Sequence, residues 1–317
     1  FKNIMIEFII NKLLIGFLII IASITALYCM IHMVPGDPIK VLLGPRATLE
    51  MQEALSIKLG LNDPLFIQII NFIKNIFRGD LGADILTQRP VLTILLEQTP
   101  HTILLVVVSI FWAILLGIPI GCYNAIYQGS LSDKLSGIIT ISFIAIPPFV
   151  VALYSLLIFA VALKWLPAIG VGESGDLSSK ISHLILPSFA VGLGWVGYLA
   201  RLVRSSMLEV LKENHVRTAR AYGISERKII LHYVLRIAIL PTITLLGTGI
   251  GILFSSSVFA EIVFSRPGIG KLIYESVINR NYPVVMGAVL VTSTLFVITT
   301  TLSDIVNAIL DPRIINK

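Results

Sequence analysis

Residues 98–132 read QTPHTILLVVVSIFWAILLGIPIGCYNAIYQGSLS, without a single Asp, Glu, Lys or Arg. A helix needs about 20 apolar residues to cross the hydrocarbon core of a bilayer. Further charge-free stretches of that length occupy residues 13–36, 135–163, 181–200, 237–260 and 281–303. Within a helix, all backbone polar groups of such a stretch bond internally, as lipid requires. The sequence therefore predicts an all-α integral membrane protein with six transmembrane helices.

The composition also favours lipid as the solvent. Hydrophobic residues make up 56% of the chain and charged residues only 13%, with a mean hydropathy of +0.92. Soluble domains carry roughly 25% charged residues, so a soluble protein with an unusually large core is disfavoured. The first apolar stretch is too long for a signal peptide. Because the chain begins at Phe1 rather than Met, the sequence leaves open whether N-terminal residues are missing.

The positive charge follows membrane topology. The net charge is +6, and with the N-terminus inside, 13 of the 24 Lys and Arg residues fall in cytoplasmic segments, eight of them between residues 201 and 236. Cytoplasmic loops carry an excess of Lys and Arg. The distribution therefore predicts that both termini are cytoplasmic, and it requires no nucleic-acid partner.

The spans divide the chain into three parts. Residues 1–36 form the N-terminal segment and first transmembrane helix. Residues 37–97 form an external segment in which the semi-apolar run 65–77 predicts a short helix that either lies on the external membrane face or caps the helix bundle. Residues 98–317 form a five-helix core with a cytoplasmic loop at 204–238.

That loop carries readable helix boundaries. A short helix over residues 215–222 is predicted to stop at Gly223, because glycine suits a left-handed helix end. Ser225 is predicted to cap the next helix, with Glu226 in its first turn. The basic loop either docks on a partner or simply stays inside against lipid headgroups, and the residues alone leave both interpretations open.

No enzyme or metal site is evident. The nucleotide-binding pattern G-x-x-x-x-G-K-[ST] is absent, so any ATP must be bound by another chain. Residues 192–197 match G-x-G-x-x-G but lie inside a predicted span, where glycines favour helix packing. Cys29 and Cys122 fall in apolar spans without metal or disulfide spacing and are interpreted as core residues.

A translocation path leaves a weaker signal. Glu261 and Asp304 lie near span ends, where we expect them to face water. The fifth span carries small and hydroxyl side chains that either line a polar route or make packing contacts, and the sequence does not decide between the two. These candidates are Gly247, Gly251, Ser255, Ser256 and Ser257.

A series of short motifs carries a family resemblance along nearly the whole chain. They are HMVPGDP (32–38), LGLNDP (59–64), GDLG (79–82), RPV (89–91), RTARAYG (217–223), EIVFSRPGIG (261–270) and RNYP (280–283). In this order and spacing, the chain resembles the dipeptide, oligopeptide and nickel branch of the permease subunits of bacterial ATP-binding-cassette importers.

The resemblance implies a type I importer permease fold in the bacterial inner membrane. It also implies a second homologous permease, two ATPase subunits that bind ATP and Mg²⁺, and an external solute-binding protein, with no cofactor in this chain. The cytoplasmic block would be the coupling helix that docks on the ATPase, which favours the docking interpretation of the loop. Its residues are Arg217, Thr218, Ala219, Arg220, Ala221, Tyr222 and Gly223.

The sequence departs from the family pattern in places. Thr218-Ala219-Arg220 stands where the broad importer signature has Glu-Ala-Ala, as expected for this branch. Asp84 stands where we expect serine, and Asn281 stands where aspartate is common. The latter two lie outside the membrane and could affect binding-protein contact or solute choice.

The residues do not identify the transported solute. Peptides are favoured on family breadth, with glutathione and nickel or other metal chelates as alternatives. Two rivals belong to other classes: a self-contained secondary carrier or channel, and a structural membrane protein. The first would need inverted repeats or ionisable residues at the membrane midplane, and neither is evident in the sequence.

Overall fold

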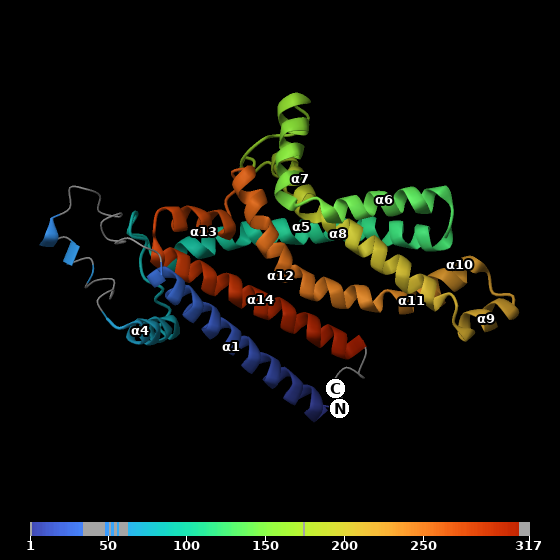
Figure 1. Ribbon diagram of the computed structural model, residues 1–317, viewed down its shortest axis with the longest axis horizontal. Helices are drawn as coiled ribbons and strands as arrows, with labels where there is room; N and C mark the ends of the chain where they lie inside the picture. The colour runs from blue at the N-terminus through green and yellow to red at the C-terminus, as the bar shows by residue number, and fades with distance from the viewer. Residues whose placement is uncertain are drawn as a thin grey trace. The chain divides into compact units, whose positions relative to one another are not determined.

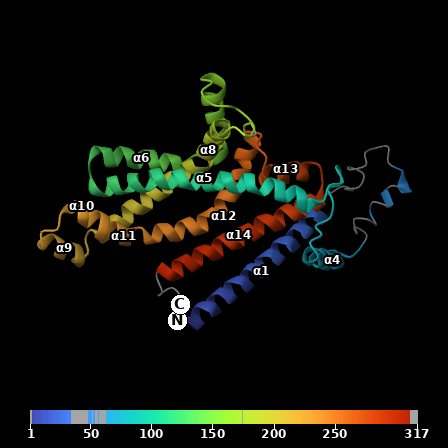
Figure 2. The same ribbon diagram turned by 180° about the vertical axis from the view of Figure 1, so that it is seen from behind.

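The computed structural model describes residues 2–33, 48–50, 52–53, 56, 63–173 and 175–310. These residues are helical apart from turns and one isolated bridge between Ala83 and Pro90 (Figures 1 and 2). The helices are α1 (Lys2–Met33), α4 (Leu65–Phe77), α5 (Val91–Ile126), α6 (Leu131–Ala145), α7 (Pro148–Ser155), the π-helix η1 (Leu156–Ala162), α8 (Leu177–Val210), α9 (Asn214–Ala221), α10 (Glu226–Lys228), the π-helix η2 (Ile229–Val234), α11 (Leu235–Ala238), α12 (Leu240–Val263), α13 (Ile269–Ile278) and α14 (Tyr282–Leu310).

The predicted all-α membrane fold is confirmed. Among the described residues, helices long and apolar enough to cross a membrane are Ile6–Ile31, Val91–Ile126, Leu177–Val210, Glu226–Gly247 and Tyr282–Ile309. A sixth span is obtained when α6 and the α7–η1 helix are counted together, although they are bent by 99° relative to each other. The motif residues 34–38 and 59–62 lie outside the described part.

The stretch 135–163, predicted as one continuous span, is broken near its middle. Ile146 and Pro147 both have extended backbone conformations, with ψ values of 122° and 143°, and Pro148 begins the next helix. A proline ring disfavours helical geometry in the residue before it and removes a backbone donor. The Pro147-Pro148 pair therefore ends α6 and restarts the chain in a new direction.

The chain forms two compact units, one of residues 1–5, 103–266 and 299–317 and the other of residues 6–102 and 267–298. This division follows contacts within the described residues. The division into 1–36, 37–97 and 98–317 follows membrane topology, which these contacts do not test, and it stays a prediction.

In the first unit, α8 is the central helix and packs on α6, α7 and α12. Glycines allow the close approaches. A Cβ at Gly121 of α5 would lie 2.6 Å from the Ala200 carbonyl oxygen of α8, and one at Gly192 of α8 would lie 2.7 Å from the Ser109 carbonyl oxygen of α5. The packing interpretation of the G-x-G-x-x-G match is confirmed.

The second unit is built around Val91, Leu95 and Ile269, which belong to one buried cluster. The Oγ1 of Thr102 accepts a 2.8 Å hydrogen bond from the backbone N–H of Ile269 and so caps the start of α13. The helix predicted over residues 65–77 is confirmed as α4, while its position on the membrane face stays a prediction.

Candidate functional site

The short helix α9 is anchored against the end of α8 by apolar side chains. Val216 and Ala219 are three residues apart, so they lie on one helix face. Both are buried in a cluster that includes Met207 of α8 and Ile229 of η2. The predicted coupling segment is therefore a packed element whose position is fixed by the transmembrane helix before it and the chain after it.

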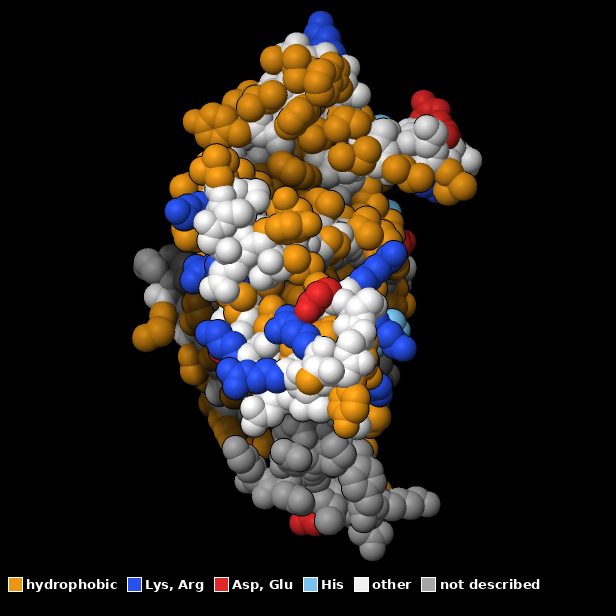
Figure 3. Space-filling model, turned by 90° about the vertical axis from the view of Figure 1, so that its right-hand side faces the viewer, with side chains coloured by type: hydrophobic (Ala, Val, Ile, Leu, Met, Phe, Trp, Pro, Cys, Tyr) orange, Lys and Arg blue, Asp and Glu red, His pale blue; other side chains and the backbone are white. Residues whose placement is uncertain are grey.

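The other face of α9 is open to solvent. The exposed members of the predicted coupling set are Arg217, Thr218, Arg220, Ala221, Tyr222 and Gly223. The Tyr222 side chain is 82% exposed. Tyr and Arg carry a large share of the binding energy at protein–protein contacts, so this surface has the composition of a docking site. Figure 3 shows Lys and Arg side chains gathered on the end that bears α9.

The predicted helix stop at Gly223 is confirmed. Its φ is +73°, and its N–H donates to the carbonyl oxygen of Arg220 at 2.9 Å. The N–H of Ile224 donates to the carbonyl oxygen of Ala219 at 3.2 Å. This pair of bonds is the Schellman helix ending, which requires a left-handed residue at the first position past the helix. Glycine adopts that conformation without steric cost.

The turn after Gly223 is held by an ion pair. Arg220 donates to both carboxylate oxygens of Glu226, at 2.6 and 3.2 Å. Ser225 occupies the predicted cap position at the start of α10, but its side chain makes no capping hydrogen bond. The predicted position is therefore right and the predicted bond is wrong, because Glu226 fixes this turn through Arg220 instead.

The candidate path residues on α12 do not share one environment. A Cβ at Gly247 would overlap Ser303 of α14, and Gly251 is also buried. Ser257 is fully buried, and its hydroxyl donates to the carbonyl oxygen of Phe254 at 2.8 Å. Ser255 is exposed and Ser256 is half-buried. The role in a path stays a prediction, and Ser255 and Ser256 are the members of the set that are not buried within this chain.

A partly buried ion pair joins α6 to α8. Arg204 donates to the two carboxylate oxygens of Asp133 through Nε at 2.7 Å and Nη2 at 2.8 Å. The backbone N–H of Gly129 donates to the same carboxylate at 2.9 Å. Sequence reasoning did not identify this pair. The sequence feature that could have indicated the pair is Asp133 itself, an acidic residue between two apolar stretches, since such a residue needs a partner.

Two departures from the family pattern meet in the second unit. Asp84 and Asn281 are 8% and 4% exposed, and the Nδ2 of Asn281 donates to Oδ1 of Asp84. The Oδ1 of Asn281 accepts from the backbone N–H of Ile85 at 3.5 Å. Thr87 donates its hydroxyl to Oδ2 of Asp84 at 2.5 Å, and the backbone N–H of Leu86 donates to Oδ1 at 2.9 Å.

These donors keep Asp84 ionised. Burial alone would raise the pKa of Asp84, but the hydrogen bonds from Thr87, Leu86 and Asn281 hold it below its ordinary value. A carboxylate whose pKa is lowered by folding contributes stability above its unfolded pKa and loses it as the pH falls through the folded pKa. The Asp84–Asn281 contact therefore stabilises the second unit at neutral pH and weakens on acidification.

Two buried charged residues lie at and just beyond the C-terminal end of α12. Glu261 is fully buried rather than facing water, which corrects the expectation from its position near a span end. Arg266 is buried too, and burial lowers its pKa while the charge of Glu261 raises it. Arg266 Nε and Nη1 are buried without a hydrogen-bond partner. Within the described residues, no cluster of His, Cys, Asp and Glu could hold a metal ion.

Known proteins resemble this chain over most of its length. The glutathione transport system permease protein GsiC of Escherichia coli (strain K12) is 34% identical over 312 residues, covering 98% of this chain and 99% of the relative. The GsiC proteins of Shigella flexneri and Salmonella typhimurium match to the same extent. The inward-facing MetNI methionine ABC transporter covers 70% of this chain and 95% of its own, with a TM-score of 0.54 and 20% identity, which shows a shared fold.

Two family descriptions cover most of the chain. Residues 117–316 match the binding-protein-dependent transport system inner membrane component, and residues 5–107 match the N-terminal part of such components. The chain therefore belongs to the family of binding-protein-dependent transport system inner membrane components, the multi-pass, non-catalytic membrane subunits of importers that work with an ATPase and a solute-binding protein.

Proposed function

We propose that this chain forms half of the translocation path of an ATP-driven importer for small peptides, with glutathione as the first solute to test. A second homologous permease would supply the other half, and two ATPase subunits would bind ATP and Mg²⁺. An external binding protein would deliver the solute. No cofactor is assigned to this chain.

The observation that carries the proposal is the construction of α9. Its buried face, through Val216 and Ala219, is continuous with the packing of α8 and η2, while its exposed face presents Arg217 and Tyr222. A movement applied to the exposed face by an ATPase would therefore be transmitted to α8 and, through η2 and α11, to α12. This is the mechanical requirement for alternating access driven from another chain.

The charge distribution supports the orientation that this mechanism needs. The segment that contains α9 holds the largest group of Lys and Arg residues in any connection between spans, and such groups stay in the cytoplasm. Both termini would then be cytoplasmic, with α13 and the 163–176 connection outside.

The relatives support the choice of solute. The GsiC proteins, 34% identical to this chain, are named as glutathione transport permeases, and glutathione is itself a tripeptide. Peptides and glutathione thus share amide bonds and a terminal carboxylate, although the first amide of glutathione is formed by the glutamate side chain. Nickel and metal chelates remain the alternative within the same family branch.

The first experiment is to purify this chain with a tag from its native membranes in mild detergent and identify the accompanying proteins and bound small molecules by mass spectrometry. A second permease, an ATPase and a binding protein are expected, with a peptide or glutathione on the binding protein. Recovery of the chain alone, under conditions that preserve other membrane complexes, would favour a self-contained carrier or channel.

A cysteine scan tests the path assignment on α12. In a chain whose Cys29 and Cys122 are replaced by Ala, Ser255→Cys is expected to react with a water-soluble maleimide about tenfold faster than Ser257→Cys, because a buried thiol reacts slowly. The measurement is the labelling rate in the folded transporter, and equal labelling of both variants after denaturation is the control. Equal rates in the folded state would remove Ser255 from the path.

A further inference from the structure

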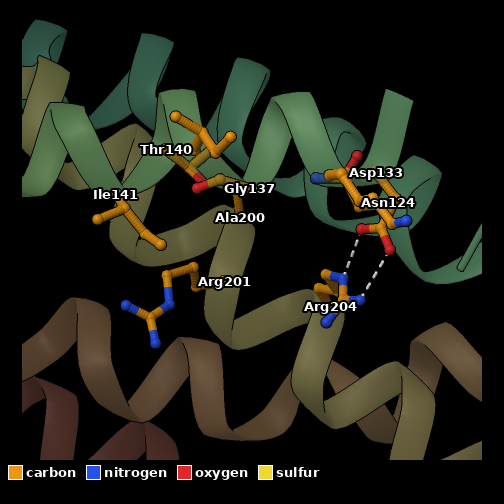
Figure 4. Close-up of a pocket in the computed structure, with 10 residues that line it drawn as sticks. Asn124, Asp133, Gly137, Thr140, Ile141, Ala200, Arg201 and Arg204 are labelled. Carbon is orange, nitrogen blue, oxygen red and sulfur yellow. Dashed lines mark hydrogen bonds and ion pairs between the residues drawn. The ribbon is translucent and has the colours of Figure 1, made fainter. Parts of the chain in front are cut away.

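A cavity opens in the first unit where α5 ends, α6 begins and α8 approaches its last two turns (Figure 4). Its volume is about 420 Å³, within the usual range of small-molecule sites. The lining residues are Asn124, Asp133, Lys134, Gly137, Ile138, Thr140, Ile141, Ala200, Arg201 and Arg204. All of them belong to the same compact unit.

The lining of this cavity is positively charged. The lining contains three cationic side chains, Lys134, Arg201 and Arg204, and one carboxylate, Asp133, which is already bonded to Arg204 through both of its oxygens. Lys134 and Arg201 make no ion pair with any residue that the structure describes. The two free cations leave the cavity ready to receive an anion.

One buried polar atom in the lining lacks a partner. The Nδ2 of Asn124 donates to the hydroxyl of Ser136 at 2.8 Å, while its Oδ1 is buried with no hydrogen-bond donor. Asn124 is only 2% exposed. A buried polar group without a partner costs about 1–3 kcal/mol. Because this oxygen is not accessible from the cavity, it offers no contact to a ligand bound there.

The remaining lining is mostly apolar and lies deeper along the helices. Ile138 and Ile141 are more than one turn of α6 beyond Lys134, and both are exposed. The charged residues lie near the ends of their helices, where a span meets the headgroup region, and the apolar residues lie toward the membrane interior. This succession of positive charge and apolar surface matches the phosphate and the acyl chains of a phospholipid.

We propose that the cavity binds an anionic phospholipid of the inner leaflet, with the phosphate at Lys134 and Arg201 and an acyl chain along Ile138 and Ile141. Phosphatidylglycerol has each of these groups. Basic cavities between transmembrane helices on the cytoplasmic side bind anionic lipid headgroups elsewhere. The bound lipid would brace α6 against α8 beside the Asp133–Arg204 pair.

Free phosphate shares the charge chemistry but not the rest of the site. It would bind at the two cations and leave Ile138 and Ile141 uncovered. A transported peptide could also place its carboxylate here. The apolar exposure next to the cations favours the lipid, and both other ligands are outcomes of the test.

The experiment measures lipid retained by the transporter, purified with its accompanying subunits, by native mass spectrometry after titration with phosphatidylglycerol or phosphatidylcholine. Each cation near an anionic lipid is worth roughly 1 kcal/mol, which is about fivefold in affinity. Arg201→Gln is therefore expected to lower phosphatidylglycerol affinity about fivefold and Lys134→Gln with Arg201→Gln about 25-fold. Lys228→Gln, which removes an exposed cation outside the cavity, is the matched control and should leave the affinity unchanged.

A second variant keeps every charge and fills the space. A Cβ added at Gly137 meets no atom within 4 Å, so Gly137→Phe can fold and project its ring into the cavity. It is expected to displace phosphatidylglycerol as strongly as the double charge variant does, while Arg201→Lys should retain it.

The possible results of these measurements distinguish a lipid from a free anion or a transported peptide as the ligand of the cavity. Preferential retention of phosphatidylglycerol over phosphatidylcholine, lost in both kinds of variant, supports the proposal. Equal retention of the two lipids, or equal loss in Lys228→Gln, overturns it. Displacement of the lipid by millimolar inorganic phosphate assigns the cavity to a free anion, and a peptide recovered in place of lipid assigns it to the translocation path; either result rejects the lipid site.

Discussion

Asn281→Asp is expected to destabilise the second unit by about 3 kcal/mol, because it places a second carboxylate in contact with buried Asp84. The Asn281 amide now donates to that carboxylate. An aspartate in its place either repels Asp84 or must hold a proton, and like charges at this separation cannot both ionise. The measurement is the thermal unfolding midpoint of the detergent-solubilised protein, together with the amount recovered from membranes.

The pH dependence of this variant has a defined sign. A carboxyl group forced to keep its proton has a raised pKa in the folded state, and the stability it contributes is lost as the pH rises through that pKa. The defect of Asn281→Asp should therefore be smaller at pH 5 than at pH 7. The wild-type protein should show the opposite trend at this site, because folding lowers the pKa of Asp84.

Matched variants separate charge from shape. Asn281→Ala removes the hydrogen bond without adding a charge, so it should cost only about 1 kcal/mol. Asp84→Ser combined with Asn281→Asp moves the single acid to the other side of the contact and is expected to recover most of the lost stability. A double variant no more stable than Asn281→Asp alone would show that the two positions do not act as a pair.

This contact also shows where single-sequence reasoning stops. Serine is expected at position 84 and aspartate at position 281, and each departure taken alone suggested a change in external binding. The two residues are separated by 197 positions in the chain, and nothing in one sequence links them. In the folded protein Asn281 donates a hydrogen bond to Asp84, so the departures compensate each other.

The long helices could be predicted because their signal is local. A charge-free stretch of spanning length must satisfy its backbone groups internally in lipid, whatever it packs against. The helix α4 could also be predicted from a local signal, which in its case is apolar residues near helical spacing. The bend between α6 and α7 was not, because counting charges cannot detect Pro147-Pro148, whose effect is on backbone geometry.

The functional residues differ in the same way: those set by local backbone conformation could be predicted, and those set by helix pairing could not. The ending of α9 depends on one backbone conformation at Gly223, so its sequence signal is clear. The Asp133–Arg204 pair and the burial of Glu261 depend on which helices meet, and helix pairing leaves little trace in composition. The cavity beside Asp133 is still harder to predict from the sequence, because it exists only where α5, α6 and α8 come together.

Gly223→Val is expected to abolish most solute-stimulated ATPase activity and uptake while leaving the amount of membrane-inserted protein unchanged. Gly223 has a φ of +73°, where an L-residue costs roughly 1–2 kcal/mol and a β-branched side chain more. No atom lies within 4 Å of an added Cβ, so the effect would come from the backbone rather than from a clash. A strain of about 2 kcal/mol lowers the population of the native turn about 30-fold relative to its alternatives.

Gly223→Asn is the control for this change. Asparagine tolerates the left-handed region better than other non-glycine residues, so this variant should keep the Schellman ending, the Arg220–Glu226 pair and most of the activity. The transmembrane spans lie outside the altered turn, so normal insertion of both variants is part of the expectation. If Gly223→Val couples ATP hydrolysis to uptake normally, or if Gly223→Asn is equally inactive, the conformation of this turn does not carry the coupling, and the docking surface must lie elsewhere on the loop.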